Sequence, residues 1–140
     1  MREVYVVAGV LWRDGRCLAV TRPAGYDWAG WWEFPGGKIA QGETREAALA
    51  RELKEELDCE PLAMEEFLAK RHVYPEYAVN LWFYHVTEFS GEPRPCEGQE
   101  LAWIDPAEPG GREFLPADIE ILERLARPEG RPRGHSTPRG

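Results

Sequence analysis

Three glutamates are spaced so that a helix would carry all of them on one face. Residues 44–57 form an unbroken run of helix-forming residues, and Glu52, Glu55 and Glu56 stand at positions i, i+3 and i+4 within it. At about 100° per residue, the three side chains fall within a sector of roughly 100°. Three carboxylates held together repel one another unless a cation lies among them, and hard divalent ions such as Mg²⁺ prefer oxygen ligands. An ordinary solvated face, with Arg51 and Glu55 in an i,i+4 ion pair, is the alternative interpretation.

The segment before this helix strengthens the metal-binding interpretation. Gly36 and Gly37 follow Pro35, and glycine allows the backbone to approach a ligand closely and to present a carbonyl oxygen to a metal ion. From Gly37 the chain continues through five residues to Glu43, and then through seven more to Arg51-Glu52-Leu53-Lys54-Glu55-Glu56. This string resembles the signature of the Nudix hydrolases, in which a loop–helix–loop carries glycine, glutamate and then R-E-aliphatic-x-E-E-x-G at this spacing.

The resemblance has one departure and extends well beyond the signature. Asp58 stands where the family has a glycine that ends the helix with a positive φ, a conformation that aspartate tolerates better than most residues. Segments typical of the MutT branch, which includes 8-oxo-dGTP diphosphatases and CTP-hydrolysing relatives, occur in the same order over residues 4–126. These segments are Glu33-Phe34-Pro35-Gly36-Gly37-Lys38-Ile39, Leu81-Trp82-Phe83, Gly91-Glu92-Pro93, Glu97-Gly98-Gln99 and Pro116-Ala117-Asp118. The resemblance implies an α/β fold, the Nudix-type α/β/α sandwich with a mixed β-sheet and a catalytic loop–helix–loop.

The same resemblance implies the residues of an active site. The backbone carbonyl of Gly36 and four carboxylates are expected to bind Mg²⁺, for which Mn²⁺ is an expected substitute. The four carboxylates, which are also the expected catalytic groups, belong to Glu52, Glu55, Glu56 and Glu97. Glu97 corresponds to a loop carboxylate that either binds metal or helps to deprotonate the attacking water. Arg51 and Glu43 are expected to hold the catalytic helix and its loop in place.

Three further residues are expected to contact the substrate. Arg22 matches a phosphate-binding position, with a plain surface arginine at a strand end as the alternative. Phe34 and Asp118 match positions that line or read the base. The implied reaction is attack of water on the β-phosphorus of a nucleoside triphosphate, which yields a nucleoside monophosphate and pyrophosphate. Bound Mg²⁺ would neutralise the phosphate charge, acidify the water and align the phosphate chain for in-line displacement.

The residue expected to read the base leaves two substrates open. An ionised Asp118 only accepts hydrogen bonds, so it would suit guanine or 8-oxoguanine, which present N1–H and an exocyclic amine side by side. Cytosine offers an amine beside an acceptor and is matched less fully, although a buried, protonated Asp118 would broaden the choice. The CTP-hydrolysing relatives share Pro-Ala-Asp-Ile with residues 116–119, and a helix N-cap is the structural alternative for Asp118. We expect oxidised guanine nucleotides such as 8-oxo-dGTP first, with CTP or dCTP as the alternative.

Around these residues, the apolar patterns predict a sheet with two helices. The predicted strands are 4–12, 17–22, 66–74, 78–88 and 101–104, and the predicted helices are 44–57 and 118–126. Both alternating sets of side chains in 78–88 are largely apolar, which predicts a central strand covered on both sides, with one helix on each face. Three loop tryptophans are interpreted mainly as packing residues, with contact of one of them with the ligand as the alternative, and none is named as a site residue; they are Trp28, Trp31 and Trp32. Residues 127–140 contain none of the apolar residues of a core, so we expect a Nudix domain over 1–126 and a disordered tail over 127–140.

Composition limits the partners of the chain. A formal net charge of −8 disfavours nucleic-acid binding, because neutralising phosphates requires clustered Lys and Arg. No apolar run reaches the roughly 20 residues of a membrane span, and the N-terminus lacks a signal-peptide pattern, so the expected location is the cytoplasm. Cys17, Cys59 and Cys96 form no C-x-x-C pair and are interpreted as reduced thiols. The expected partner is a small-molecule nucleotide, and the expected oligomeric state is a monomer or weak homodimer.

Two other functions are weighed against this one. A nucleotide-sensing Nudix module without catalysis is disfavoured because such modules lose signature carboxylates, and here all of them are present. A hydrolase of nucleotide sugars or dinucleoside polyphosphates is disfavoured because those relatives carry extra segments that this compact chain lacks.

Overall fold

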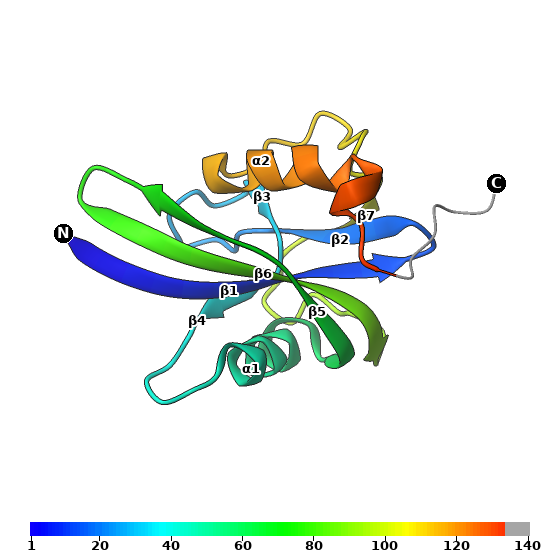
Figure 1. Cartoon of the computed structure of the whole chain (residues 1–140), viewed down its shortest axis with the longest axis horizontal. Coiled ribbons are helices and arrows are strands. Elements are labelled where there is room, and N and C mark those ends of the chain that lie inside the picture. The colour runs from blue at the N-terminus through cyan, green and yellow to red at the C-terminus, as the bar shows by residue number, and fades with distance from the viewer. Residues whose placement is uncertain (134–140) are drawn as a thin grey trace.

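A mixed β-sheet runs through the middle of the protein, with one helix on each side (Figure 1). The computed structural model describes residues 1–133. The elements in chain order are β1 (Arg2–Arg13), β2 (Arg16–Thr21), β3 (Trp32–Glu33), β4 (Gly36–Lys38), α1 (Arg45–Leu57), β5 (Glu60–Val73), β6 (Tyr77–Ser90), β7 (Leu101–Ile104), α2 (Pro116–Leu125) and the 3₁₀ turn η1 (Pro128–Gly130).

The long strand β1 organises the sheet. It pairs in parallel with β6 from Arg2 opposite Tyr77 to Leu11 opposite Val86, while its other edge pairs antiparallel with β4 and then with β2. The strand order is β3-β2-β1-β6-β5, with β4 attached to β1 and β7 attached to β2. Parallel and antiparallel pairs therefore occur in one sheet, which confirms the predicted mixed α/β sandwich.

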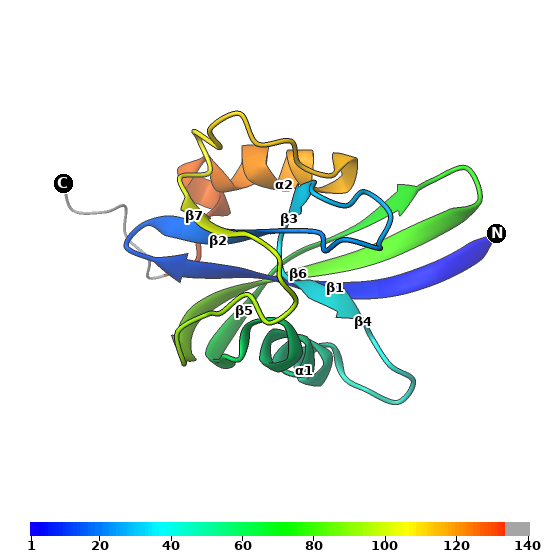
Figure 2. The same ribbon diagram turned by 180° about the vertical axis from the view of Figure 1, so that it is seen from behind.

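Two apolar cores lie on opposite faces of this sheet. On one face, Leu49, Leu53 and Leu57 of α1 are fully buried against β1, β2 and β6. On the other face, Ile121 and Leu125 of α2 are fully buried. The two ribbon views place α1 and α2 on opposite sides of the strands (Figures 1 and 2). Each fully buried leucine stabilises the fold by about 2 kcal/mol, so α1 is held firmly in register with the sheet.

Both ends of α1 are fixed by local hydrogen bonds. The Thr44 hydroxyl accepts a hydrogen bond from the Ala47 backbone N–H at 3.1 Å, as expected for an N-cap. At the other end, Asp58 adopts the left-handed conformation with φ 56° and ψ 40°, and its N–H donates to the Lys54 carbonyl at 3.1 Å. The substitution of aspartate for the family's glycine therefore preserves the turn that ends the helix.

The strand β6 is central and β5 is an edge strand. Phe83 belongs to the core under α2, whereas Tyr84 and Val86 belong to the core under α1, which confirms that this strand is covered on both sides. The strand β5 begins at Glu60, earlier than the predicted 66–74, and it includes Pro61. A proline is tolerated there because the outer edge of β5 pairs with no other strand among residues 1–133.

The prediction of disorder from residue 127 onward is not met by the described residues 127–133. These residues continue past α2 into η1, and the Arg131 guanidinium lies 4.9 Å from the centre of the Trp12 ring while donating to the Gly15 carbonyl at 3.2 Å. The Arg133 N–H donates to the Glu65 carboxylate at 3.1 Å. Arginine packing on an aromatic face anchors this segment without large apolar residues, which a hydropathy pattern does not detect. Residues 134–140 lie outside the described residues.

Candidate active site

The glycine loop before α1 is fitted tightly against β1. Gly36 pairs with Ala8, and a Cβ atom at position 36 would collide with the backbone carbonyl of Val7. The Gly9 N–H donates to the Pro35 carbonyl at 2.8 Å, which fixes the chain just before the glycines. Only a glycine fits such a close approach, so the backbone of this loop is held rigidly at the mouth of the site.

Gly37 leaves space for the carboxylate of Glu52. A Cβ atom built on Gly37 would lie 2.5 Å from Glu52 Cδ and 2.6 Å from both carboxylate oxygens. The Glu52 side chain is only 16% exposed. The helix and the glycine loop are therefore complementary, and the loop fixes where one expected metal ligand lies.

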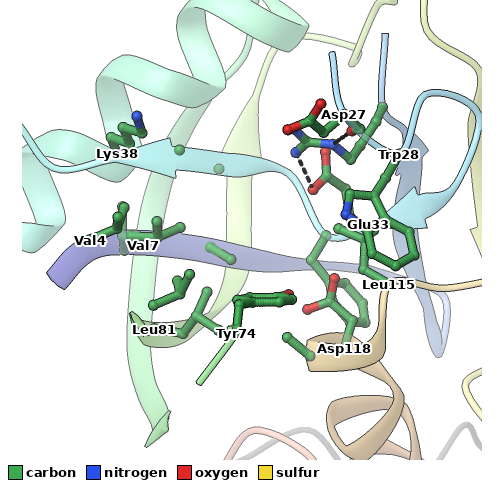
Figure 3. Close-up of a pocket in the computed structure, with 18 of the residues that line it drawn as sticks. Val4, Val7, Asp27, Trp28, Glu33, Lys38, Tyr74, Leu81, Leu115 and Asp118 are labelled. Carbon is green, nitrogen blue, oxygen red and sulfur yellow. Dashed lines mark hydrogen bonds and ion pairs between the residues drawn. The ribbon is translucent and has the colours of Figure 1, made fainter. Parts of the chain in front are cut away.

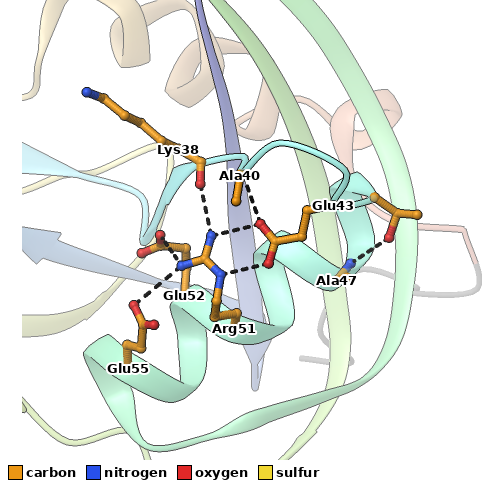
Figure 4. A network of polar contacts seen from close by, with 8 residues as sticks. Lys38, Ala40, Glu43, Ala47, Arg51, Glu52 and Glu55 are labelled. Carbon is orange, nitrogen blue, oxygen red and sulfur yellow. Dashed lines mark hydrogen bonds and ion pairs between the residues drawn. The ribbon is translucent and has the colours of Figure 1, made fainter.

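Arg51 is the centre of a polar network that ties the loop to α1 (Figure 4). Its guanidinium donates to both carboxylate oxygens of Glu43, at 2.7 and 2.9 Å, and to the Lys38 carbonyl at 3.0 Å. It also pairs with Glu52 at 2.9 Å and Glu55 at 3.5 Å. The hydrogen bonds from Arg51 lower the pKa of Glu43 to about 2. This geometry supports the positioning roles expected for Arg51 and Glu43.

Glu56 is the carboxyl group whose surroundings most need a cation. Its Oε2 atom is buried and has no hydrogen-bond partner among residues 1–133. Burial, followed by the adjacent Glu52 and the charges of Glu97 and Glu33, raises the pKa of Glu56 to about 10. A divalent cation at this position would compensate both the burial and the repulsion. The partly buried carboxylates of Glu52 and Glu56 beside a backbone loop therefore fit the hard-cation site that was expected from the sequence.

Glu97 lies on a loop that is pinned to the C-terminal end of α1. The side chain of Gln99 accepts a hydrogen bond from the Glu97 N–H at 2.9 Å and donates to the Glu56 carbonyl at 3.2 Å. The Cys96 N–H also donates to the Glu56 carbonyl, at 3.2 Å. Gln99 is buried, so this bridge holds the expected loop carboxylate beside the catalytic helix.

The expected metal ligands lie in one region, but their side chains do not converge on a common point where a metal ion would bind. Within residues 1–133, no three carboxylate, thiolate or imidazole side chains already converge as a group that could hold a metal ion. Glu52 and Glu56 interact directly, and Glu97 lies close enough to affect the pKa of Glu56. Glu55, in contrast, is 57% exposed and is paired with Arg51. In this conformation, Arg51 supplies the positive charge that faces two of the expected ligands.

A cavity of about 400 Å³ lies next to this region, on the side of the sheet that carries α2 (Figure 3). This volume falls within the roughly 300–1,000 Å³ of small-molecule sites. Its lining contains Gly36 and the three expected substrate-binding residues, Arg22, Phe34 and Asp118. Its floor is apolar and includes Val6, Val79 and Leu81. The cavity thus runs from the base-reading position to the glycine loop of the carboxylate helix.

Asp118 lies inside this cavity and is not a helix N-cap. It is the third residue of α2, whose N-cap is Leu115 and has no side-chain cap bond. Asp118 is 6% exposed, and burial, followed by repulsion from Glu33, raises its pKa well above the usual value, against the opposing charges of Lys70 and Arg22. The neutral carboxyl is therefore favoured, which is the second of the two protonation states that the sequence left open for Asp118.

Arg22 is held by the protein at the edge of the cavity. Its guanidinium donates to the Glu33 carboxylate at 3.2 Å and to the Asp27 carbonyl at 2.7 Å. Burial raises the pKa of Glu33, while Arg22 opposes this shift and Glu97 adds to it. The charge of Glu33 raises the pKa of Asp118, at the base-reading end of the cavity, and also the pKa of Glu56 on the carboxylate helix. Glu33 therefore lies between these two regions of the site.

A family model described as a NUDIX domain matches residues 6–124, which include the whole signature and nearly all of the sheet. The chain belongs to the Nudix family. A CTP pyrophosphohydrolase of Escherichia coli is 39% identical over 133 residues, covering 91% of this chain and 98% of the relative. An 8-oxo-dGTP diphosphatase of Haemophilus influenzae is 37% identical over 123 residues, covering 87% of this chain and 90% of the relative.

Solved Nudix structures share the fold. The solution structure of the E. coli ORF135 protein superposes with a TM-score of 0.79 at 39% identity, covering 91% of this chain and 95% of that chain. The crystal structure of a MutT Nudix hydrolase from Burkholderia pseudomallei gives a TM-score of 0.80 at 27% identity, covering 88% of this chain and 98% of that chain. This chain is therefore a Nudix hydrolase, from a family whose enzymes use a divalent metal ion and act on nucleotides.

Several residues of this Nudix site were not identified as site residues from the sequence. Glu33 and Gln99 stand in the segments that carried the family resemblance, but neither was given a role. Tyr74 lines the cavity from the hairpin between β5 and β6, and no motif marks it. Trp28 also lines the cavity, so it is the member of the three loop tryptophans that is placed to touch a ligand.

Over the described residues, no helix is long and apolar enough to cross a membrane.

Proposed function

We propose that this Nudix hydrolase is a Mg²⁺-dependent nucleoside triphosphate pyrophosphohydrolase that prefers 8-oxo-dGTP and related oxidised nucleotides. Such an activity would remove damaged precursors before DNA synthesis and so limit mutation. The observation that carries the proposal is the single cavity shared by Asp118 at one end and by the Gly36–Gly37 loop at the other. A base held at Asp118 would direct its phosphates past the glycine loop toward the carboxylates of α1.

The chemistry of Asp118 supports a preference for oxidised guanine. A neutral carboxyl offers one O–H donor and one C=O acceptor. The oxidised base presents an N7–H donor beside the O6 acceptor, so both groups of a neutral Asp118 find partners. Guanine itself presents acceptors at both N7 and O6, which leaves the Asp118 carbonyl facing an acceptor. An unmatched buried polar pair of this kind is costly, and this cost supports discrimination between the two bases.

The phosphate end of the site is assigned to the α1 region. The Gly36 carbonyl and the carboxylates of Glu52, Glu55, Glu56 and Glu97 are the groups that would hold Mg²⁺. When bound, Mg²⁺ supplies neutralisation of phosphate charge and acidification of water. Arg51 and Glu43 keep α1 and the glycine loop in register through their bidentate ion pair. Arg22, already oriented by Glu33, contributes a positive charge for the phosphates.

The proposed reaction is hydrolysis between the α- and β-phosphates. The oxygen of water forms a bond to the β-phosphorus, and the bond from that phosphorus to the α,β-bridging oxygen breaks. Glu97 accepts the proton released by the water, and the bridging oxygen leaves with the nucleoside monophosphate. The second product is pyrophosphate. Gln99 holds the Glu97 backbone beside α1, so the loop is fixed close to the carboxylates of the helix.

Hydrolysis of CTP or dCTP is the second candidate, and two observations favour it. The E. coli CTP pyrophosphohydrolase is 39% identical over nearly its whole length. A neutral Asp118 also matches cytosine, because its O–H donates to N3 while its carbonyl accepts from the exocyclic amine. The reaction and the roles of the carboxylates are the same for either substrate.

The test is pyrophosphate release in the presence of Mg²⁺ across 8-oxo-dGTP, dGTP, CTP and dCTP. A kcat/KM for 8-oxo-dGTP that exceeds that for dGTP by roughly 100-fold would support a role in removing oxidised nucleotides before DNA synthesis. A preference for CTP or dCTP would support the second candidate instead. Absence of turnover with every nucleotide, together with tight Mg²⁺-dependent binding, would contradict a hydrolase and indicate a sensor.

Amide variants separate the catalytic carboxylates from the fold. Glu55→Gln and Glu56→Gln keep the side-chain shape but remove a charge that would bind metal, so each should lower kcat by at least about 100-fold. Glu123→Gln on the exposed face of α2 is the matched control and should retain wild-type kcat. Similar thermal unfolding of all three variants would show that the fold is intact. Near wild-type kcat in both Glu55→Gln and Glu56→Gln would contradict the assignment of these residues as metal ligands.

A further inference from the structure

The loop of residues 23–31, between β2 and β3, is folded around Arg22. The Arg22 N–H donates to the Trp31 carbonyl at 2.9 Å, and the Arg22 carbonyl accepts from the Gly30 N–H at 3.0 Å. The guanidinium of Arg22 donates to the Asp27 carbonyl at 2.7 Å and lies 5.8 Å from the centre of the Tyr26 ring. Arg22, which also borders the cavity, therefore holds both the ends and the middle of the loop by hydrogen bonds.

This fastening holds Trp28 in an uncommon backbone conformation. Its φ is +64°, in the left-handed region that bulky side chains rarely adopt. The Trp28 carbonyl accepts from the Trp31 N–H at 3.0 Å, and the two indoles meet edge to face with centroids 4.9 Å apart. Conformations of this kind persist where the surrounding structure imposes them, and they are concentrated at functional sites.

The conformation directs Trp28 into the substrate cavity. Trp28 lines that cavity and remains 43% exposed, so a large aromatic surface faces space that a ligand would fill. Tyr74 lines the same cavity, supported by stacking on Tyr77 at 4.9 Å and by the His72 ring at 4.6 Å. In Figure 3, Tyr74 and Trp28 lie on either side of Asp118.

We propose that Trp28 and Tyr74 are specificity residues whose rings form two aromatic walls of the nucleobase site. The walls hold the base so that its edge faces Asp118. This inference rests on the proposed function and adds the residues that grip the base. A flat, bicyclic purine overlaps an indole more fully than a single-ring pyrimidine does, so the walls favour purine nucleotides. Neither residue belongs to the glycine–glutamate signature, because the walls come from the loop after β2 and from the hairpin between β5 and β6.

The decisive variants are Trp28→Gly and Trp28→Phe. Glycine adopts a φ near +64° without strain, so Trp28→Gly removes the ring while keeping the loop. Phenylalanine restores an aromatic wall. Tyr5→Ala is the matched control, because Tyr5 is 51% exposed and stacks on Trp82 without lining the cavity. Thermal unfolding of each variant reports whether the fold is retained.

Two readouts are measured on each protein. Steady-state kinetics with 8-oxo-dGTP and dCTP give KM and kcat separately, and calorimetry without metal gives the Kd of 8-oxo-dGMP. Stacking of a base on an aromatic side chain changes affinity by roughly 5- to 150-fold. Trp28→Gly should therefore raise KM and Kd for the purine by about tenfold or more, raise KM for dCTP less, and change kcat by less than about threefold. Trp28→Phe should recover most of the affinity, and Tyr74→Ala should repeat the loss while Tyr74→Phe does not.

The outcomes separate the two proposals. Wild-type KM and Kd in Trp28→Gly, in an enzyme that turns over nucleotides, would overturn the aromatic walls and leave the hydrolase standing. Ring-dependent binding of 8-oxo-dGMP by a protein without turnover would support the walls and contradict the hydrolase. Loss of kcat with unchanged KM would assign Trp28 to the positioning of the loop and overturn its role in gripping the base.

Discussion

The carboxylate of Glu52 lies so close to Gly37 that a Cβ atom at position 37 would stand 2.5 Å from Glu52 Cδ. Six residues of connecting chain, 39–44, separate β4 from α1, yet the loop and the helix fit together without space for one methyl group. The identity of one loop residue therefore determines where a carboxylate on the next helix can lie. This relationship gives the signature's glycine a physical role that can be tested.

Gly37→Ala should lower kcat with little loss of stability. The added methyl group forces the Glu52 carboxylate to move, and misplacing a catalytic group by about 1 Å costs roughly 10- to 100-fold in rate. The side chain of Glu52 is a flexible chain that can turn away, so the fold should accept the change. Steady-state kinetics and thermal unfolding measure the two effects. An unchanged kcat would mean that the position of Glu52 is not important for turnover.

Gly42→Ala is the matched comparison within the same loop. A Cβ atom at Gly42 meets nothing within 4 Å, but the φ of +82° is strained for alanine. This variant should therefore lower the unfolding temperature while leaving kcat close to the wild-type value. If Gly42→Ala lowers kcat as much as Gly37→Ala does, loop conformation rather than the Glu52 contact explains both results.

Glu43→Gln should weaken the attachment of the glycine loop to α1. Arg51 holds the pKa of Glu43 at about 2, below the ordinary value of 4.5, so the ionised form is preferred in the folded state. The stabilisation is present above pH 4.5 and is lost as the pH falls toward 2. Thermal unfolding of wild type and Glu43→Gln should therefore differ at neutral pH and converge in acid. A difference that does not depend on pH would exclude the ion pair as its source.

Gln99→Leu should disturb the Glu97 loop. The substitution keeps a similar volume but leaves the Glu97 N–H and a lone pair of the Glu56 carbonyl without their partner. Each unsatisfied buried group costs about 1–3 kcal/mol, so stability should fall measurably. Turnover should fall by about tenfold or more because Glu97 loses its position. Wild-type kcat in a destabilised variant would show that Gln99 supports the fold alone.

The sequence predicts the chemistry of α1 better than it predicts the substrate cavity. The helix, its Thr44 cap and the burial of its leucines follow from local periodicity and cap chemistry. Asp58 adopts the left-handed conformation that the departure from glycine required, because aspartate accepts that conformation. These features are determined by residues that are neighbours in sequence, so a single sequence carries the necessary information.

The cavity, in contrast, is assembled from distant segments. Trp28, Tyr74 and Asp118 come from two loops and a helix, and no spacing along the chain indicates that they line one space. The helix N-cap that was the structural alternative for Asp118 is not found, because α2 begins at Pro116, which places the carboxyl within the first turn. Its protonation state depends on burial and on Glu33, which the sequence alone does not place nearby.

Asp118→Asn should remove a pH dependence of base binding. The folded-state pKa of Asp118 is raised above the ordinary value of 3.8, so the neutral carboxyl stabilises the folded protein fully below pH 3.8, and this stabilisation is lost as the pH rises through the folded-state pKa. An ionised Asp118 can no longer donate to O6 of the base. The Kd of 8-oxo-dGMP, measured by calorimetry without metal, should therefore rise with pH in the wild-type protein.

The asparagine variant keeps one donor and one acceptor at every pH. Its Kd for 8-oxo-dGMP should therefore lack the pH dependence contributed by Asp118, and its unfolding free energy relative to wild type should increase as the pH rises. Binding without metal is the useful measurement because it involves no turnover, and comparison with Asp118→Asn removes any pH dependence that the two proteins share. The groups facing Asp118 that tune this transition are Glu33, which raises the pKa, and Lys70 and Arg22, which lower it. A wild-type Kd that is flat with pH, or one that rises equally in Asp118→Asn, would contradict a role for the protonated carboxyl in base recognition.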